Sequence, residues 1–332
     1  MAYLFSGGIT MSKTNGKTDT QVDREFKALA DFLSPFNEKE VQDAVERNLA
    51  FFKQNDERNY QAAIAYYNKY KLWGLYAPQY GIRELAENRA QALNGHMEDF
   101  EWLYQRLGDY RSRVILTNIL YYWLMSKYPR IAQIQDHTFP QYFDLDLVRC
   151  DKNEVFVDIG AYTGDTVLSY IRTFGEDCYK RIYCYEILPA DIDLIKKNVE
   201  QNKLKNVEIR NKGAADKPGT LYLNRPSDSV SSIAQLVETG DIEVPTVAID
   251  DDIKEPVTFI KMDIEGAEEQ ALLGCRRQIA DHHPKLALSV YHNHKDLWKL
   301  AKMIEGYDPS YRFYLRYYGN ALLPTEYLLY AV

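Results

Sequence analysis

A change in hydrophobic pattern near residue 150 constrains the fold more than any other feature of the sequence. Beyond it, short runs rich in β-branched and aromatic residues alternate with amphipathic segments, as in "EVFVDIG", "DTVLSYIRTFG", "RIYCYEI" and "ADIDLIKKNVEQN". Strands joined by such crossovers pair in parallel, and helices cover both faces of the sheet. The last two runs, "YRFYLRYY" and "EYLLYAV", have no helix between them and predict a closing antiparallel hairpin. We therefore expect an α/β domain with a doubly wound sheet over residues 150–332.

The first half of the chain has helical periodicity instead. In "EVQDAVERNLAFF" the apolar residues repeat along one face of a helix, and Asn37 with Glu40 three residues later has the form of a helix start. Further helices are expected over 56–73, 81–93, 96–107 and 110–128. The sequence thus predicts an all-α accessory domain over 21–140, preceded by a flexible tail over 1–20. Its segments rich in Tyr and Trp are interpreted as core and interface, with an acceptor-binding surface as the alternative.

Charge and cysteine content exclude several classes of function. The chain has 40 Lys and Arg against 48 Asp and Glu, a net charge of −8, and so lacks the positive field that binds nucleic acids or anionic membranes. Its 4 cysteines form no C-x-x-C pair, so neither a disulfide framework nor a thiolate zinc site is expected. We find no apolar run of about 18 residues that could span a membrane, and no signal peptide. These features predict a cytoplasmic protein.

The segment "VFVDIGAYTGDTVLSY" carries the main functional inference. A strand ends near Asp158 and Gly160, passes through a tight turn containing Gly164, and opens a helix whose cap is Asp165 or Thr166. In a doubly wound sheet, a nucleotide-like cofactor lies outside the carboxyl ends of the strands, at this kind of turn. Glycines allow the backbone to approach such a ligand closely.

Spacing within this turn favours one class of ligand. Aligning Gly160 with the central glycine of a Gly-x-Gly-x-x-Gly dinucleotide fingerprint puts Asp158 and Thr163 where the flanking glycines should be. An aspartate beside a pyrophosphate would weaken binding, whereas it suits the ammonium and sulfonium groups of S-adenosylmethionine, which has no phosphate. Glu186, at the end of "RIYCYEI", can accept both ribose hydroxyls. A NAD enzyme would place an acid there too, so Glu186 alone does not discriminate.

Four successive segments resemble the signatures of the FkbM family of S-adenosylmethionine-dependent methyltransferases: "FVDIGAYTGDT", "CYEILPADIDLIKKNV", "EVPTVAIDD" and "FIKMDIEGAEEQALLG". The resemblance covers about residues 153–332 and does not reach the helical half. It implies a seven-stranded Rossmann-like methyltransferase fold that acts on hydroxyl groups, often of sugars or natural products. It also implies that Asp158, Gly160 and Gly164 form the methionine-side loop, that Glu186 holds the ribose, and that "NKGAADKPG" lies along the adenine, with contacts from Ala215 or Asp216.

Two clusters at later strand ends are candidates for acceptor chemistry. "KMDIEGAEE" places Asp263 and Glu265 at the end of one strand, and "SVYHNHKD" places His292 and His294 at the end of the next. We expect His292 to be the general base, because the pKa of an imidazole lies near working pH. The two acids could instead be helix caps. The His-x-His pair could also share one strand face and bind a divalent metal, although a polar loop is the favoured interpretation.

Together these features predict an S-adenosylmethionine-dependent methyltransferase that methylates a hydroxyl of a sugar, polysaccharide precursor or natural product. The helical half would select the acceptor or form a homodimer surface. The alternatives are a NAD(P)-dependent oxidoreductase or epimerase, disfavoured by the missing glycines and by the lack of a Tyr-x-x-x-Lys pair, and a non-catalytic cofactor-binding protein. The predicted catalytic residues are His292, Asp263 and Glu265. The predicted cofactor-binding residues are Asp158, Gly160, Ala161, Tyr162, Gly164, Asp165, Thr166, Glu186, Ala215, Asp216 and Asp263.

Overall fold

The structure is a computed structural model that describes residues 19–70, 73–223, 236–237, 240 and 242–332. The tail predicted over 1–20 lies outside the described residues except for its last two positions. One of these, Thr20, caps the first helix, and its hydroxyl accepts a hydrogen bond from the amide of Asp23. Within the described ranges, no helix combines the length and apolarity that a bilayer crossing requires.

Helices make up most of the first half of the chain, as its periodicity predicts. They are α1 (Gln21–Leu33), α2 (Glu38–Asn55), α3 (Glu57–Tyr70), the short 3-10 helix η1 (Pro78–Tyr80), α4 (Glu84–Gly95), α5 (Met97–Arg106), α6 (Tyr110–Met125) and α7 (Tyr128–Ala132). The expected start of α2 is confirmed as a capping box. The Glu40 amide donates to Oδ1 of Asn37 at 3.0 Å, and the Asn37 amide donates to Oε2 of Glu40 at 2.9 Å.

A seven-stranded sheet confirms the predicted Rossmann-like fold class. Its order is β10-β11-β9-β8-β1-β2-β3, and the five strands from β9 to β3 are parallel. β11 runs antiparallel to both β9 and β10, so the C-terminal hairpin is confirmed. The strands are β1 (Val155–Ile159), β2 (Arg181–Glu186), β3 (Val207–Asn211), β8 (Phe259–Met262), β9 (Lys285–Ser289), β10 (Phe313–Tyr317) and β11 (Tyr327–Ala331).

Crossover helices connect these strands: α8 (Asp165–Phe174), α9 (Pro189–Gln201), α10 (Ile249–Asp252), α11 (Glu268–Leu273), α12 (Arg276–His282) and α13 (Asp296–Tyr307). The sequence did not predict a second, four-stranded sheet of order β4-β7-β5-β6 between β3 and β8. It comprises β4 (Gly213–Ala214), β5 (Gly219–Leu223), β6 (Leu236–Val237) and β7 (Ile242–Val247). Two of its strands have two residues each, too few to produce a periodic pattern.

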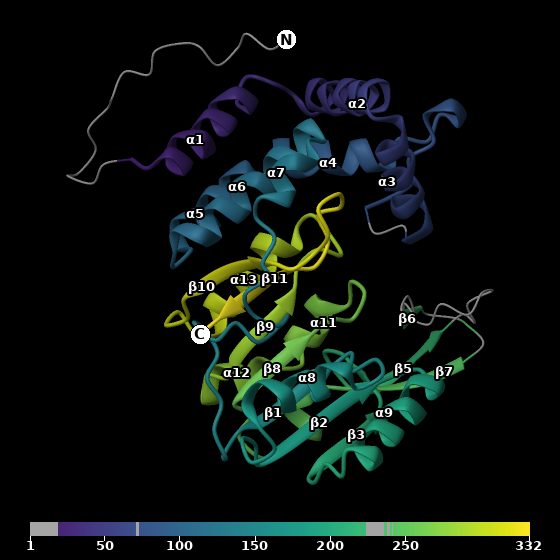
Figure 1. Ribbon diagram of the computed structural model, residues 1–332, viewed down its shortest axis with the longest axis vertical. Helices are drawn as coiled ribbons and strands as arrows, with labels where there is room; N and C mark the ends of the chain where they lie inside the picture. The colour runs from purple at the N-terminus through teal and green to yellow at the C-terminus, as the bar shows by residue number, and fades with distance from the viewer. Residues whose placement is uncertain (1–18, 71–72, 224–235, 238–239, 241) are drawn as a thin grey trace.

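One continuous apolar cluster joins the helical half to the large sheet. It includes Leu49 and Trp123 in the helices and Leu288 and Leu315 in the strands. Figure 1 shows α1 to α7 gathered at one end of the molecule, beside β10 and β11, with β3 and α9 at the opposite end. α6 packs on β10, and the Ser112 hydroxyl of α6 accepts from the amide of Leu315. Because the core is shared, the division into a helical domain over 21–140 and a sheet domain over 150–332 stays a prediction.

Candidate active site

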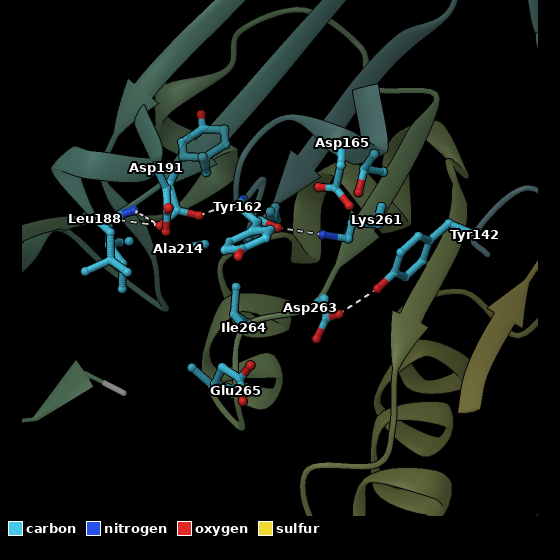
Figure 2. Close-up of a pocket in the computed structure, with 18 of the residues that line it drawn as sticks. Tyr142, Tyr162, Asp165, Leu188, Asp191, Ala214, Lys261, Asp263, Ile264 and Glu265 are labelled. Carbon is cyan, nitrogen blue, oxygen red and sulfur yellow. Dashed lines mark hydrogen bonds between the residues drawn. The ribbon is translucent and has the colours of Figure 1, made fainter. Parts of the chain in front are cut away.

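A cavity of about 370 Å³ lies at the carboxyl ends of the parallel strands, where a doubly wound sheet binds its ligands. Two groups of segments line it, and Figure 2 shows residues of both. The β1–β2 end consists of the turn after β1, the end of β2 and the chain leading into β4. The β8 end consists of Asp263 and Glu265 after β8, Tyr142 and Tyr291 from two loops, Glu326 before β11, and Tyr66 and Tyr70 of α3.

The turn after β1 is shaped by a close backbone contact. Gly160 has φ +83°, and a Cβ at this position would lie 1.9 Å from the carbonyl oxygen of Asp263. Only glycine fits here, so the turn can pack against the chain that leaves β8. Gly164, also at positive φ, occupies the N-cap of α8, and Asp165 is the first helical residue. The expectation that Asp165 or Thr166 caps this helix is therefore wrong.

Beneath the turn lies a buried ion pair. Nζ of Lys261 is 3.0 Å from Oδ1 of Asp158, with both side chains almost fully buried, and it donates a hydrogen bond of 2.7 Å to the carbonyl of Gly160. Burial raises the pKa of Asp158 to about 6, although Lys261 opposes the shift. Asp158 thus supports the turn from below and does not line the cavity. This differs from the expectation that its charge faces the ligand.

Glu186, at the end of β2, is fixed by the backbone. Its Oε2 accepts from the amide of Tyr162 at 2.8 Å, and its Oε1 accepts from the amides of Ile187 at 2.7 Å and Leu188 at 3.0 Å. Burial raises the pKa of this carboxyl, and the three amides oppose that shift. An ionised carboxylate has about four acceptor positions, so Glu186 keeps capacity for a hydroxyl donor in the cavity that it lines.

At the β8 end, tyrosines surround the two predicted acids. Tyr142 donates a hydrogen bond of 2.6 Å to Oδ2 of Asp263, and the Tyr291 hydroxyl lies 3.5 Å from Oδ1. Glu265 has φ +57°, a left-handed conformation that costs a non-glycine residue roughly 1–2 kcal/mol. Burial raises the pKa of Glu265 to about 7, with His292 opposing. A side chain held in this way at a cavity wall is typical of a functional position.

His292 lies behind this wall and does not line the cavity. Its Nδ1 is 2.9 Å from Glu268, and its Nε2 is 3.5 Å from Asp263 and 3.6 Å from Glu265. Burial alone would lower the pKa of His292. The three carboxylates outweigh burial and raise this pKa to about 10. The premise that made His292 the preferred base, a pKa near neutrality, is therefore wrong for this environment.

The two histidines of the His-x-His pair do not converge. β9 ends at Ser289, so His292 and His294 lie beyond the strand and share no strand face. His294 packs instead against the rings of Trp73 and Trp123. Burial lowers its pKa well below the usual value, which indicates a neutral imidazole in an apolar environment. A metal held by this pair is therefore not supported.

Some of the residues predicted from the sequence line the cavity and others lie beside it. Those that line it are Gly160, Tyr162, Asp165, Thr166, Glu186, Asp263 and Glu265. Those that do not are Asp158, Ala161, Gly164, Ala215, Asp216 and His292. Near the expected adenine contacts, the lining residues are Lys212, Gly213 and Ala214. Lining residues that the sequence did not predict include Tyr66, Tyr70, Tyr142, Asp191, Lys261, Tyr291 and Glu326.

Of these missed residues, Lys261 alone had a signal in the sequence. It stands within "VTFIKMD", where a lysine interrupts an apolar run predicted to be a buried strand, and a buried lysine requires a partner. Asp191 and Tyr291 stand near the predicted Glu186 and His292 in the sequence, but no local pattern marks them as lining residues. Tyr66, Tyr70, Tyr142 and Glu326 come from separate segments that only the tertiary fold brings to the cavity. One link is a hydrogen bond of 2.7 Å from Nε1 of Trp73, in the helical half, to the carbonyl of Tyr291.

The cavity lining is acidic. Its carboxylates are those of Asp165, Glu186, Asp191, Asp263, Glu265 and Glu326. Lys212 and Lys261 also line it, but each pairs with an acid outside the lining, Asp252 and Asp158 respectively. Within the described residues, the cavity therefore offers no unpaired lysine or arginine to a phosphate, and its field favours a ligand with positive charge.

Comparisons with known proteins agree with this geometry. The methyltransferase FkbM domain matches residues 158–321. The crystal structure of methyltransferase FkbM from Methylobacillus flagellatus is similar with a TM-score of 0.64 and 26% identity, over 76% of this chain and 62% of that chain. This chain thus spans less than two thirds of the length of that protein. No curated protein matches the sequence.

Weaker structural similarity extends to other methyltransferases. A Streptococcus mutans protein assigned as a methyltransferase and solved with SAH has a TM-score of 0.36 and 16% identity, over 55% of this chain and 89% of that chain. A SAM-dependent methyltransferase from Aquifex aeolicus has a TM-score of 0.34 and 14% identity, over 62% of this chain and 97% of that chain. The family match includes the cavity-lining segments after β1, β2 and β8, whereas Tyr66, Tyr70, Tyr142 and Glu326 lie outside it. Through residues 158–321, the chain belongs to the FkbM methyltransferase family.

Proposed function

We propose that the protein uses S-adenosylmethionine to methylate a hydroxyl group of a sugar, a polysaccharide precursor or a natural product. The acidic cavity beside the glycine turn carries this proposal. S-adenosylmethionine has a sulfonium and an ammonium group and no phosphate, so it matches a lining rich in carboxylates whose two lysines are already paired. A nicotinamide dinucleotide would bring its pyrophosphate into the same negative field.

The β1–β2 end would hold this cofactor. Glu186 would accept the ribose hydroxyls, with its carboxylate already oriented by three backbone amides. Asp165, which Figure 2 shows beside Lys261, would face the positive groups of the methionine part, while Asp191 lines the cavity on the Leu188 side. The chain around Gly213 and Ala214 would lie along the adenine, with Ala215 and Asp216 beside it. Gly160 permits the close approach of the turn that these contacts require.

The β8 end would receive the acceptor and its proton. When bound, the cofactor supplies a methyl group already activated by a sulfonium, so the protein must orient the acceptor hydroxyl and remove its proton. Asp263, Glu265 and Glu326 are the carboxylates that line this end, and the first two follow β8 directly. Tyr142 fixes Asp263 through its hydrogen bond of 2.6 Å. Glu265 accepts the proton in this proposal, while His292 stabilises both acids from behind the wall.

Cofactor binding provides the direct test. We expect calorimetry to show S-adenosylhomocysteine binding with one site, and no comparable heat with NAD. Glu186→Gln should weaken this binding by about 1.5–3 kcal/mol, because a charged acceptor of hydrogen bonds is lost, or roughly tenfold to 150-fold in Kd. Glu200→Gln, at an exposed position of α9, is the matched control and should bind normally. Binding of NAD in place of S-adenosylhomocysteine would support the oxidoreductase alternative instead.

The aromatic pair on α3 should contribute to acceptor binding. Tyr66 and Tyr70 line the cavity with ring centroids 4.4 Å apart, and aromatic contacts are worth about 0.5–1.5 kcal/mol beyond the area they bury. Tyr66→Ala or Tyr70→Ala should therefore raise the KM for the acceptor by up to about tenfold. The affinity for S-adenosylhomocysteine should not change. Tyr80→Ala, at a 79% exposed residue outside the cavity lining, is the control. A loss of S-adenosylhomocysteine affinity without a change in KM would contradict this role.

A further inference from the structure

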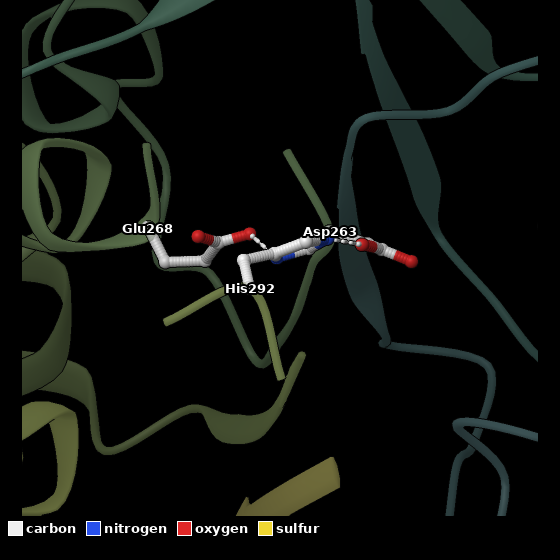
Figure 3. A group of neighbouring side chains, drawn as sticks. All are labelled: Asp263, Glu268 and His292. Carbon is white, nitrogen blue, oxygen red and sulfur yellow. Dashed lines mark ion pairs between the residues drawn. The ribbon is translucent and has the colours of Figure 1, made fainter. Parts of the chain in front are cut away.

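The buried His292 lies between the carboxylates of Asp263 and Glu268 behind the β8 end (Figure 3). The His292 side chain is 1% exposed and lies between Glu268 on one side and Asp263 and Glu265 on the other. Asp263, Glu268 and His292 each offer a ligand atom, and these atoms lie within 4.8 Å of one another. Asp263 and Glu265 also line the cavity, so the cluster is continuous with the candidate active site.

Three buried polar atoms of this cluster lack hydrogen bonds within the described residues. In the part of the chain that the structure describes, neither ring nitrogen of His292 makes a well-directed hydrogen bond, and Oε2 of Glu268 has no hydrogen-bond partner. Nδ1 lies 2.9 Å from Oε1 of Glu268, close enough for that carboxylate to orient the ring. Buried polar atoms without partners are costly. An imidazole nitrogen directed at carboxylates 3.5 and 3.6 Å away points to an ion between them.

Carboxyl groups also outnumber basic groups around the imidazole. The carboxyls of Asp296 and Glu326 interact electrostatically with His292 as well, in addition to the three that surround it. Lys261, whose charge interacts with Asp263, pairs with Asp158. A cation would offset this excess, and a divalent ion would do so more completely than a protonated imidazole alone.

We propose that Nε2 of His292 and the carboxylates of Asp263 and Glu265 bind a divalent metal ion, with Glu268 orienting the imidazole through Nδ1. Two ligands of one metal, each with a bond of about 2.1 Å, lie roughly 3–3.5 Å apart. The observed separations of 3.5 and 3.6 Å would need to close only slightly. A carboxylate behind a ligating histidine is the usual arrangement around such ions. Two oxygen ligands and one imidazole suit Mn²⁺, Mg²⁺ or Zn²⁺.

The position of this site suggests what the ion does in methyl transfer, and this role rests on the proposed function. Because Asp263 and Glu265 line the cavity, the ion would face it and could bind the acceptor hydroxyl oxygen. This would lower the pKa of the hydroxyl. Its proton would pass to a carboxylate oxygen of Glu265 while the oxygen–methyl bond forms and the sulfur–methyl bond breaks. Metal binding itself does not depend on methyl transfer and can be tested separately.

The test is direct binding of Mn²⁺ to the full-length protein after dialysis against a chelator. The electron paramagnetic resonance signal of free Mn²⁺ should fall until one equivalent is bound. Asp263→Asn and Glu265→Gln should each weaken this binding at least about tenfold, since each replaces a charged ligand with an amide. Glu269→Gln is the matched control, because Glu269 lies on α11 beside Glu268 but pairs with Lys299. This control should bind Mn²⁺ like the wild type.

Titration with S-adenosylhomocysteine, performed on the same samples, verifies that each variant is folded. It also separates failure of the metal proposal from failure of the proposed function. Absence of a stoichiometric Mn²⁺ site in protein that binds S-adenosylhomocysteine would overturn the metal proposal alone. Mn²⁺ bound equally well by Asp263→Asn and Glu265→Gln would overturn it too, because the ion would then lie elsewhere. If the protein bound one equivalent of Mn²⁺ but did not bind S-adenosylhomocysteine, the metal proposal would be supported and the proposed use of S-adenosylmethionine would be contradicted.

Discussion

Replacing Lys261 by Met is expected to lower the free energy of unfolding by about 3–5 kcal/mol, the usual cost of removing one member of a buried ion pair. Lys261 lies in the centre of the sheet, 3.0 Å from Asp158, and also donates to the carbonyl of Gly160. Methionine keeps much of the side-chain volume but provides neither interaction. Urea denaturation of the wild type and the variant measures the difference.

The pH dependence of this loss has a definite sign. The folded-state pKa of Asp158 is already raised by burial to about 6, above the value of about 3.9 expected in the unfolded chain, and loss of Lys261 should raise it further. An acid with a raised folded pKa binds more protons in the folded state, so stability falls as pH rises above the unfolded pKa. The deficit of the variant should therefore be smallest near pH 4 and should grow toward neutrality.

The matched control for Lys261→Met removes both charges. In the double variant Asp158→Asn, Lys261→Met, no buried charge is left without its partner, so most of the lost stability should return. Lys196→Met, at a side chain 61% exposed on α9, should change stability little. If Lys261→Met changed the free energy of unfolding as little as Lys196→Met, Asp158 would not depend on this lysine. The ion pair would then not support the turn after β1.

Glu265→Gln is expected to lower kcat by about 10²- to 10⁴-fold, the range that general-base catalysis contributes. Glutamine has the shape of glutamate but cannot accept the acceptor proton, and it would be a weaker ligand for a metal ion. Affinity for S-adenosylhomocysteine should stay at the wild-type value, because Glu265 belongs to the β8 end and the cofactor to the β1–β2 end. Release of S-adenosylhomocysteine with a panel of sugars and other polyhydroxylated acceptors measures turnover.

Glu269→Gln again serves as the control for turnover, since Glu269 does not line the cavity. It should turn over at the wild-type rate. Undiminished kcat in Glu265→Gln would exclude Glu265 as the base and leave Asp263 as the remaining carboxylate of this pair. Tight binding of S-adenosylhomocysteine without transfer to any acceptor, in the wild type as well, would favour a non-catalytic cofactor-binding protein.

The sequence predicted those parts of the protein that local patterns determine. The glycine turn after β1, the acid ending β2 and the antiparallel hairpin each lie within one short segment, where residue type and spacing suffice. The capping box of α2 is equally local. By contrast, β4 and β6 are too short for any periodicity, so the second sheet escaped prediction.

Properties set by distant contacts could not be predicted in this way. The pKa of His292 depends on Glu268 and on two acids from the end of another strand, so its ordinary solution value was misleading. Asp158 was placed correctly in its strand, but its partner is more than 100 positions away. Tyr66 of α3 reaches the cavity because the helical half docks on β10 and β11. No spacing rule within one segment contains that information.

The apolar cluster shared between α1 to α7 and the sheet limits how the protein can be shortened. A fragment starting at residue 150 would keep the glycine turn and Glu186, yet it would expose to water the side of β10 on which α6 packs. It would also lose Trp73 and with it the hydrogen bond that holds the loop of Tyr291. A fragment trimmed to the family match would therefore be prone to aggregate, and its cavity would lack the lining residues Tyr66, Tyr70 and Tyr142.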